Sequence, residues 1–214
     1  YKRQLYEASE PHLSADTILS SNTSTLPLES LLEGVPEARR EKFAITHFFN
    51  PPKVMRLVEL IASGSTEATL RTTIEQTLGK IALECRDTPG FIANRVGCYW
   101  MAAGVARARE FDVSYELADA SFGRAFGIPR TGIFGLLDYI GLQLVKPIWT
   151  SLETALPAGD PLLDVPLGDD SFIEGLVSRG LTGRTGDGGF YRGRDEVINA
   201  DYEYVPRTQP TDPV

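Results

Sequence analysis

Apolar and polar positions follow two different patterns on either side of residue 87. Before it, short apolar runs rich in β-branched residues alternate with stretches whose apolar residues recur at helical spacing. The runs that predict strands are 16–21, 43–49, 57–62 and 81–85. The stretches that predict helices are 1–13, 28–32 and a segment that begins at Ser65 or Thr66 and ends at Gly79. This alternation predicts a sheet with flanking helices.

From residue 88 onward, helical periodicity dominates the chain. Helices are predicted at 92–110, 115–126, 136–156 and 171–179, with no convincing strand among them. A glycine-dense loop at 181–191 follows, and the polar, proline-dotted residues 193–214 predict an extended tail or linker. The chain is therefore expected to contain an α/β domain over 1–87, an all-α C-terminal domain over 88–192 and a tail over 193–214.

Composition and charge narrow the class of protein. The chain has 214 residues, is 42% hydrophobic and carries a formal net charge of −8, which argues against a nucleic-acid or anionic membrane surface. No apolar run approaches 18 residues and no signal peptide is recognisable, so no membrane association is predicted. Cys85 and Cys98 lie in apolar surroundings without metal-ligand spacing, which predicts buried, reduced thiols, no metal site and a cytoplasmic location.

The chain contains only two histidines, His12 and His47, and their surroundings differ. His12 follows a proline in a polar segment and is expected at the surface. His47 lies near the end of one predicted strand, and the next predicted strand contains Glu59. If the two strands form a hairpin centred near Lys53, His47 and Glu59 face each other, close enough for the carboxylate to reach the ring.

A carboxylate that holds one nitrogen of an imidazole leaves the other nitrogen able to accept a proton. The pair of His47 and Glu59 would then be a general base and its orienting partner. Spacing alone equally allows a half-buried cross-strand ion pair without catalytic use, so both interpretations remain open at this point.

Several blocks of the sequence, in this order, resemble the 3-hydroxyacyl-CoA dehydrogenases of fatty-acid β-oxidation. They are SNTS (21–24), HFFNP (47–51), LVE (57–59), DTPGFIANR (87–95), FGLLDYIGL (134–142) and LTGRTG (181–186). The resemblance extends from about residue 2 to residue 191. It implies a Rossmann-type domain followed by a helical C-terminal domain, NAD as cofactor, an acyl-CoA substrate and a homodimer formed through the helical domain.

The resemblance also implies roles for individual residues. His47 would take the proton from the 3-hydroxyl group of the substrate, and Glu59 would orient it. Ser24 and Asn94 match residues that hydrogen-bond around the substrate oxygen and the histidine, and Asn50 matches a residue that contacts the acyl-CoA. Matches to cofactor-contacting positions are Lys2, Asn22, Ser24 and Arg184.

Four of these matches have a structural alternative. Ser24 could instead cap the short helix that follows it, and Asn94 could hydrogen-bond the backbone at the start of its own helix. Lys2 and Arg184 could be solvated surface charges.

One feature typical of the family is not found in the sequence. The family opens with a strand that runs into a Gly-x-Gly-x-x-Gly turn for the dinucleotide, and this combination is not found here; the glycines at 183–189 follow the helical domain instead. We therefore expect a chain that begins partway through the nucleotide-binding domain, keeps only a remnant of it, lacks most of the NAD site and has no turnover on its own. The residue that would distinguish NAD from NADP is then also absent.

Other departures bear on the subfamily. Residues 129–134 read PRTGIF where many short members have PMGPF, and Ala102 stands where a glutamate is usual. These features are closer to long bacterial proteins in which the dehydrogenase precedes an enoyl-CoA hydratase. Two other functions stay open: a dehydrogenase of a small hydroxy acid without CoA, of the gulonate type, and a helical dimerisation module with a vestigial histidine pair.

Overall fold

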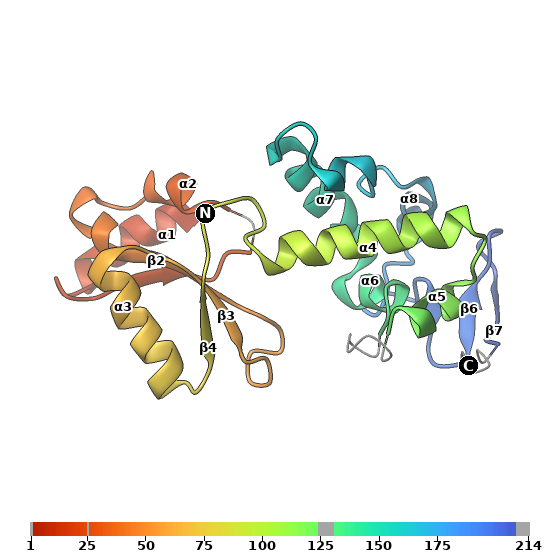
Figure 1. The fold of residues 1–214 in the computed structure, drawn as a ribbon, viewed down its shortest axis with the longest axis horizontal. Coiled ribbons are helices and arrows are strands. Elements are labelled where there is room, and N and C mark those ends of the chain that lie inside the picture. Colours follow the sequence, from red (N-terminus) through yellow and green to blue (C-terminus); the bar gives the residue numbers. More distant parts are fainter. Residues whose placement is uncertain (1, 25, 124–130, 209–214) are drawn as a thin grey trace. The chain divides into compact units, whose positions relative to one another are not determined.

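The protein is described by a computed structural model, shown in Figure 1, that covers residues 2–24, 26–123 and 131–208. The chain divides into two compact units, Tyr1–Arg95 and Val96–Val214, and each is described by itself. The division falls a few residues after the predicted domain boundary at residue 87. No helix in the described part of the chain is long and apolar enough to cross a membrane.

The first unit is built on a four-stranded mixed sheet with the order β1-β2-β3-β4. Its strands are β1 (Leu19–Ser21), β2 (Phe43–Phe48), β3 (Leu57–Ile61) and β4 (Ile81–Glu84). β1 runs parallel to β2 and β3 runs parallel to β4, whereas β2 and β3 form an antiparallel hairpin. All four strands lie within the ranges predicted from the apolar runs.

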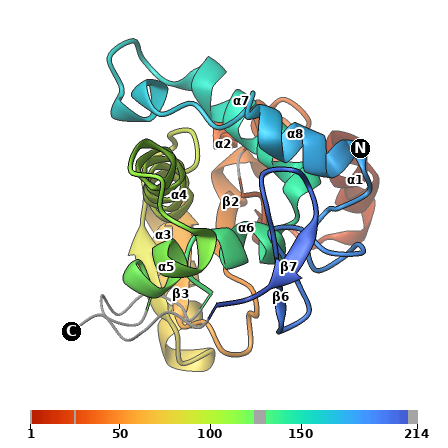
Figure 2. The ribbon, with the colours of Figure 1, turned by 90° about the vertical axis from the view of Figure 1, so that its right-hand side faces the viewer.

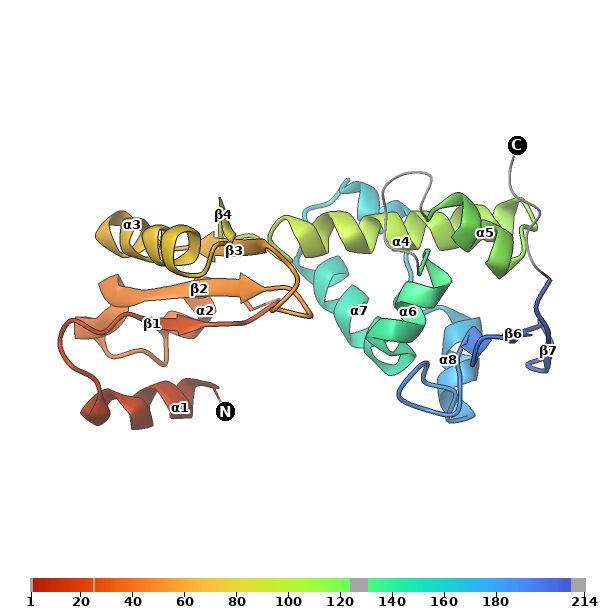
Figure 3. The ribbon, with the colours of Figure 1, turned by 90° about the horizontal axis from the view of Figure 1, so that it is seen from below.

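Helices cover both faces of this sheet, as Figure 3 shows for α1 and α3. They are α1 (Lys2–Ser9), α2 (Leu28–Leu32) and α3 (Gly64–Thr72), and α3 continues as a π-helical turn to Thr77. Side chains of α1 and α2 pack with Phe43, Ile45 and Ile61 on one face. Ile74 packs with Val58 and Leu60 on the other. Because side chains alternate along a strand, His47 and Glu59 share the face of Ile45 and Ile61.

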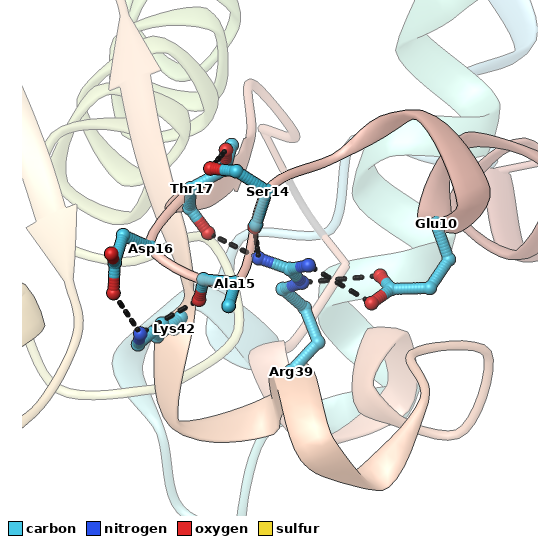
Figure 4. Close-up of polar contacts among 7 residues, drawn as sticks. All are labelled: Glu10, Ser14, Ala15, Asp16, Thr17, Arg39 and Lys42. Carbon is cyan, nitrogen blue, oxygen red and sulfur yellow. Dashed lines mark hydrogen bonds and ion pairs between the residues drawn. The ribbon is translucent and has the colours of Figure 1, made fainter.

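A buried arginine fastens the segment after α1 to the rest of the unit (Figure 4). Arg39 lies in the 3₁₀ helix Glu37–Lys42 and is only 4% exposed. Its guanidinium donates to both carboxylate oxygens of Glu10, at 2.9 and 3.1 Å, and to the carbonyl oxygens of Ser14 and Thr17. This fork of donors explains how a charged side chain is accommodated inside the unit.

The second unit is mainly helical. Its helices are α4 (Ala93–Glu110, which begins in the first unit), α5 (Tyr115–Ser121), α6 (Phe134–Ile140), α7 (Val145–Ala155) and α8 (Ser171–Ser178). They enclose an apolar core that includes Phe134, Trp149 and Phe190. The part of the predicted helix 115–126 beyond residue 123 lies outside the described residues, as do Pro129 and Arg130.

The predicted helix 136–156 is two helices in the structure. Gly141 separates them with φ at +103°, a conformation that helical residues do not adopt. The amide of Leu142 then donates to the carbonyl oxygen of Thr182 and so leaves the helical hydrogen-bonding pattern. Apolar residues continue at helical spacing on both sides of the break, so the pattern concealed it.

The described part of the predicted tail over 193–214 contains strands and not an extended linker. Three short strands, β5 (Tyr191–Arg192), β6 (Glu196–Ile198) and β7 (Tyr204–Pro206), form an antiparallel sheet, and β6 and β7 lie side by side in Figure 2. Val197 and Ile198 are buried. The predicted tail was therefore wrong for residues 196–206, because two apolar residues suffice to anchor a strand that is too short to show alternation.

Candidate active site

His47 and Glu59 face each other across the hairpin of the first unit. The register pairs them directly, as the sequence predicted, and His47 Nδ1 lies 2.7 Å from Glu59 Oε2. His47 is 5% exposed and Glu59 is completely buried. The two side chains therefore form a short, shielded hydrogen bond.

The second carboxylate oxygen of Glu59 is also occupied. Glu59 Oε1 accepts hydrogen bonds from the backbone amides of Ile92, at 2.9 Å, and Ala93, at 2.7 Å, where α4 begins. Burial raises the pKa of Glu59, but the hydrogen bonds from His47, Ala93 and Ile92 outweigh it and hold that pKa below its ordinary value. Glu59 is therefore ionised at neutral pH.

The ionised state of Glu59 determines the tautomer of His47. An ionised carboxylate can only accept, so Nδ1 of His47 carries the hydrogen and donates it. Nε2 is then the nitrogen with a lone pair, and a proton that it takes up gives an imidazolium stabilised by the adjacent carboxylate. The arrangement has the chemistry of a general base.

Two aromatic rings flank the imidazole. The ring centroids of Phe49 and Phe91 lie 4.6 Å and 5.9 Å from that of His47, and both rings are tilted with respect to it. Phe91 is buried in the core of the unit. Apolar walls of this kind keep water from the pair and strengthen its electrostatic interaction.

Asn22, Ser24 and Asn94 lie in the same unit as the pair. The side-chain oxygen of Asn22 accepts from the amide of Phe48, which places Asn22 beside the end of β2, where His47 is. The side-chain amide of Asn94 donates to the carbonyl oxygen of Ser24 at 3.0 Å. Asn22 and Ser24 follow β1, which runs parallel to β2, so these residues and His47 belong to the same edge of the sheet. Ligands of open α/β sheets bind at such carboxyl-terminal edges.

The structure gives the helix after Ser24 a different cap from the one considered from sequence. The amides of Leu28 and Glu29 at the start of α2 donate to the carboxylate of Asp87, and Pro27 occupies the N-cap position. Asp87 follows β4 and ties the two segments together. Ser24 is exposed and does not cap α2.

The other predicted site residues, Asn50, Lys2 and Arg184, lie on three different segments of the chain. Asn50 is exposed and begins the loop between β2 and β3. Lys2 is the first residue of α1. Arg184 belongs to the second unit, in the glycine-dense loop, with its guanidinium 5.3 Å from the ring of Tyr139. Binding of a cofactor by Lys2 and Arg184 stays a prediction.

Cys85 and Cys98 are buried thiols outside any disulfide, as the sequence predicted. Burial, followed by the charge of Glu59, raises the pKa of the Cys85 thiol to about 11, which keeps it protonated and unreactive. Among the described residues, no cluster of three or more histidine, cysteine, aspartate or glutamate side chains could hold a metal ion.

Comparison with known protein families matches both units. The family model "3-hydroxyacyl-CoA dehydrogenase, NAD binding domain" matches residues 1–88, and "3-hydroxyacyl-CoA dehydrogenase, C-terminal domain" matches residues 90–193. The chain belongs to the 3-hydroxyacyl-CoA dehydrogenase family. A match over residues 1–88 contradicts the expectation that the chain lacks the NAD-binding part of the family. The expected lack of turnover, which depended on it, loses its basis.

Individual relatives agree with this family. The chain is 42% identical to a "Putative fatty acid oxidation complex trifunctional enzyme" of Rickettsia prowazekii, over 96% of this chain and 30% of the relative. It is 33% identical to the mitochondrial hydroxyacyl-coenzyme A dehydrogenase of Sus scrofa, over 89% of this chain and 59% of the relative. The chain thus spans about a third to three fifths of the length of these relatives.

Solved structures of the family confirm the predicted fold class. The (S)-3-hydroxybutyryl-CoA dehydrogenase of Ralstonia eutropha aligns with a TM-score of 0.76 and 28% identity, over 90% of this chain and 66% of that one. A Rossmann-like domain followed by a helical C-terminal domain is therefore the fold of this chain, with the small β5-β6-β7 sheet as an addition to the helical unit.

Sequence reasoning missed the backbone donors of the site. The amides of Ile92 and Ala93 hold Glu59, yet an amide is present at nearly every residue and leaves no mark on the sequence. Pro89 and Gly90 before a helical pattern were the available signal, since they indicate a tight turn into a helix.

Proposed function

We propose that the protein oxidises (S)-3-hydroxyacyl-CoA to 3-oxoacyl-CoA with NAD as the oxidant, as part of fatty-acid oxidation. The observation that carries the proposal is the buried hydrogen bond between His47 and Glu59 in a chain of this family. The names of its relatives, which include a hydroxyacyl-CoA dehydrogenase and a 3-hydroxybutyryl-CoA dehydrogenase, support the substrate class.

In this proposal, each residue of the pair has one task. Nε2 of His47 accepts the proton of the 3-hydroxyl group, and Glu59 stabilises the imidazolium that results. Bound NAD supplies the acceptor for the hydride that leaves C3. Phe49 and Phe91 exclude water from the imidazole, so that the proton passes to His47 and not to solvent.

The residues at the carboxyl-terminal edge of the sheet suit a nicotinamide dinucleotide. Asn22 uses its side-chain oxygen on Phe48, and the NH2 group of the same amide can donate to a carboxamide or ribose oxygen. Ser24 is exposed and carries a hydroxyl that donates or accepts. We assign the cofactor contacts to Asn22 and Ser24 with Lys2 and Arg184, and the acyl-CoA contact to Asn50.

Two finer points belong to the same proposal. The 42% identity to the trifunctional relative, against 33% to the mitochondrial enzyme, supports a place among the long bacterial members of the family. The helical unit is proposed to form a homodimer, for which α4 offers an exposed apolar face.

A comparison of substrates tests the proposal against a dehydrogenase of free hydroxy acids. The complete gene product should reduce NAD with (S)-3-hydroxybutyryl-CoA at a kcat/KM at least about a hundredfold above that with free 3-hydroxybutyrate or gulonate, because remote binding energy of the CoA contributes to kcat/KM. Equal or faster turnover of the free acids would assign the site to the other class. NAD reduction is followed by absorbance.

A further inference from the structure

The start of α4 holds the carboxylate that orients His47. Glu59 is completely buried, and three donors surround its oxygens: His47 on Oε2, and the amides of Ile92 and Ala93 on Oε1. α4 is 18 residues long, so its N-terminus adds a favourable dipole to the two direct hydrogen bonds. A buried carboxylate stays charged only when it is paired in this way.

The turn that aims these amides has an unusual backbone. Gly90 and Phe91 have positive φ angles, +73° and +49°. The amide of Phe91 donates to the carbonyl of Thr88, and the amide of Arg95 donates to the carbonyl of Gly90, so the turn is closed on both sides. Glycine adopts this conformation freely, but phenylalanine rarely does, and such residues gather at functional sites.

Phe91 affects the His47–Glu59 pair through both its backbone and its side chain. Its backbone precedes the amides of Ile92 and Ala93, and its side chain is buried with its ring 5.9 Å from the ring of His47. The ring of Phe91 is anchored in the core, and its backbone has the left-handed conformation that aims the first amides of α4 at Glu59.

We infer that Phe91 is a positioning residue for the His47–Glu59 pair: its left-handed turn holds Glu59 through the first amides of α4 and thereby fixes the tautomer of His47. The catalytic consequence rests on the proposed function, whereas the tautomer is a property of the folded chain. The titratable groups around Glu59 are the imidazole of His47 and the thiol of Cys85, and that thiol stays protonated across the neutral range.

Two substitutions separate backbone conformation from core packing. Phe91→Gly keeps the freedom to adopt a positive φ and loses the ring. Phe91→Ile keeps apolar bulk, but its β-branched side chain opposes the left-handed conformation. Positioning predicts that Phe91→Ile disturbs the pair and that Phe91→Gly preserves it, whereas a role in packing alone predicts the reverse order.

Nitrogen NMR of the histidines reads the tautomer directly. The chain has only His12 and His47, and the exposed His12 serves as an internal reference. His47 of the unmodified protein should show a single tautomer protonated at Nδ1. Phe91→Ile should give a mixture of tautomers and lower kcat/KM about tenfold, the loss expected when a misaligned turn competes with the correct one. Phe91→Gly should keep the single tautomer, and the tautomer is the readout for this variant, because loss of the ring also opens the imidazole to water.

A backbone replacement tests the same point without changing a side chain. Exchange of the Ala93 amide for an ester replaces the N–H that donates to Glu59 with an oxygen and leaves every side chain unchanged, and it should also mix the tautomers of His47. The same exchange at Ala102, inside α4, removes a helical hydrogen bond far along the chain from Glu59 and should leave His47 unchanged. A single Nδ1-protonated tautomer in both Phe91→Ile and the Ala93 ester would overturn the inference.

The readouts distinguish this inference from the proposed function. If the protein lacks dehydrogenase activity but the tautomer responds as described, the positioning role stands and the proposed reaction fails. If the protein is active and the tautomer does not respond, the positioning role fails alone.

Discussion

Asp138 is a buried carboxylate whose pKa lies far from its ordinary value. Its two oxygens accept from the amides of Phe190 and Tyr191, at 2.9 and 2.8 Å. Burial, together with the charge of Asp119, raises the pKa of Asp138 to about 6, and these hydrogen bonds and Arg184 only partly offset the rise. The side chain thus joins α6 to the start of β5. Burial favours the protonated form of Asp138 more than water does.

This pKa predicts a pH dependence of stability in the second unit. The folded state holds the Asp138 proton up to about pH 6, whereas the unfolded chain loses it near its ordinary pKa, so unfolding free energy should fall as pH rises between these values. The expected loss is about 2 to 3 kcal/mol from pH 4 to pH 7. Both tryptophans, Trp100 and Trp149, lie in this unit, so their fluorescence during urea unfolding reports on it selectively.

Asp138→Asn is the matched variant. It should be less stable than the unmodified protein by about 1 to 3 kcal/mol, because one of the two amides then meets an NH2 group instead of an acceptor. Its unfolding free energy should change less with pH over the same range. A stability difference between the unmodified protein and Asp138→Asn that does not shrink from pH 4 to pH 7 would contradict this account.

At the scale of single residues, the sequence sufficed where the geometry of a regular element fixes neighbours. A two-residue period and a hairpin centre placed Glu59 opposite His47, and the register confirms it. It did not suffice where the contact is made by backbone groups. The carboxylate of Asp87 accepts from the first amides of α2, and Glu59 accepts from the amides of Ile92 and Ala93. Both contacts join segments that are distant in the sequence.

At the scale of elements, α4 presents two exposed apolar side chains on one face. Val96 is 63% exposed and Tyr99 is 41% exposed, and residues three apart lie on the same side of a helix. Exposed apolar residues that gather on one face commonly mark an interface. We propose a second copy of the chain as the occupant, consistent with the homodimer proposed for the helical unit.

Sedimentation velocity tests this face. The protein should sediment as a dimer at micromolar concentrations, and Val96→Lys combined with Tyr99→Lys should weaken association at least about tenfold, because charges would be buried at the interface. Val54→Lys is the control, since Val54 is 71% exposed in the first unit and should not affect association. A monomer, or a dimer unaffected by the double variant, would refute this interface.

The lengths of elements were harder to predict than their types. The strands of the first unit lie within their predicted ranges because each apolar run is bounded by polar or turn residues. The break at Gly141 and the strands β6 and β7 were missed for opposite reasons. Apolar periodicity continues across the break, whereas the two strands are three residues each and show no periodicity.

At the scale of the whole molecule, the two units make different contributions to the proposed activity. The first unit contains the His47–Glu59 pair and the predicted residues Lys2, Asn22, Ser24, Asn50 and Asn94. The second contains Arg184 and the proposed dimer face. The change of pattern near residue 87 indicated this organisation. The family was indicated by several sequence blocks that occur together in the order typical of its members.

The most direct test of the account is the activity of His47→Gln in the complete gene product with (S)-3-hydroxybutyryl-CoA and NAD. The account predicts that kcat falls by about a hundredfold to ten-thousandfold, the contribution typical of a general base, while the protein stays folded. His12→Gln, which changes the exposed histidine, should keep full activity. A His47→Gln protein with kcat close to that of the unmodified protein would contradict the central claim that His47 is the base.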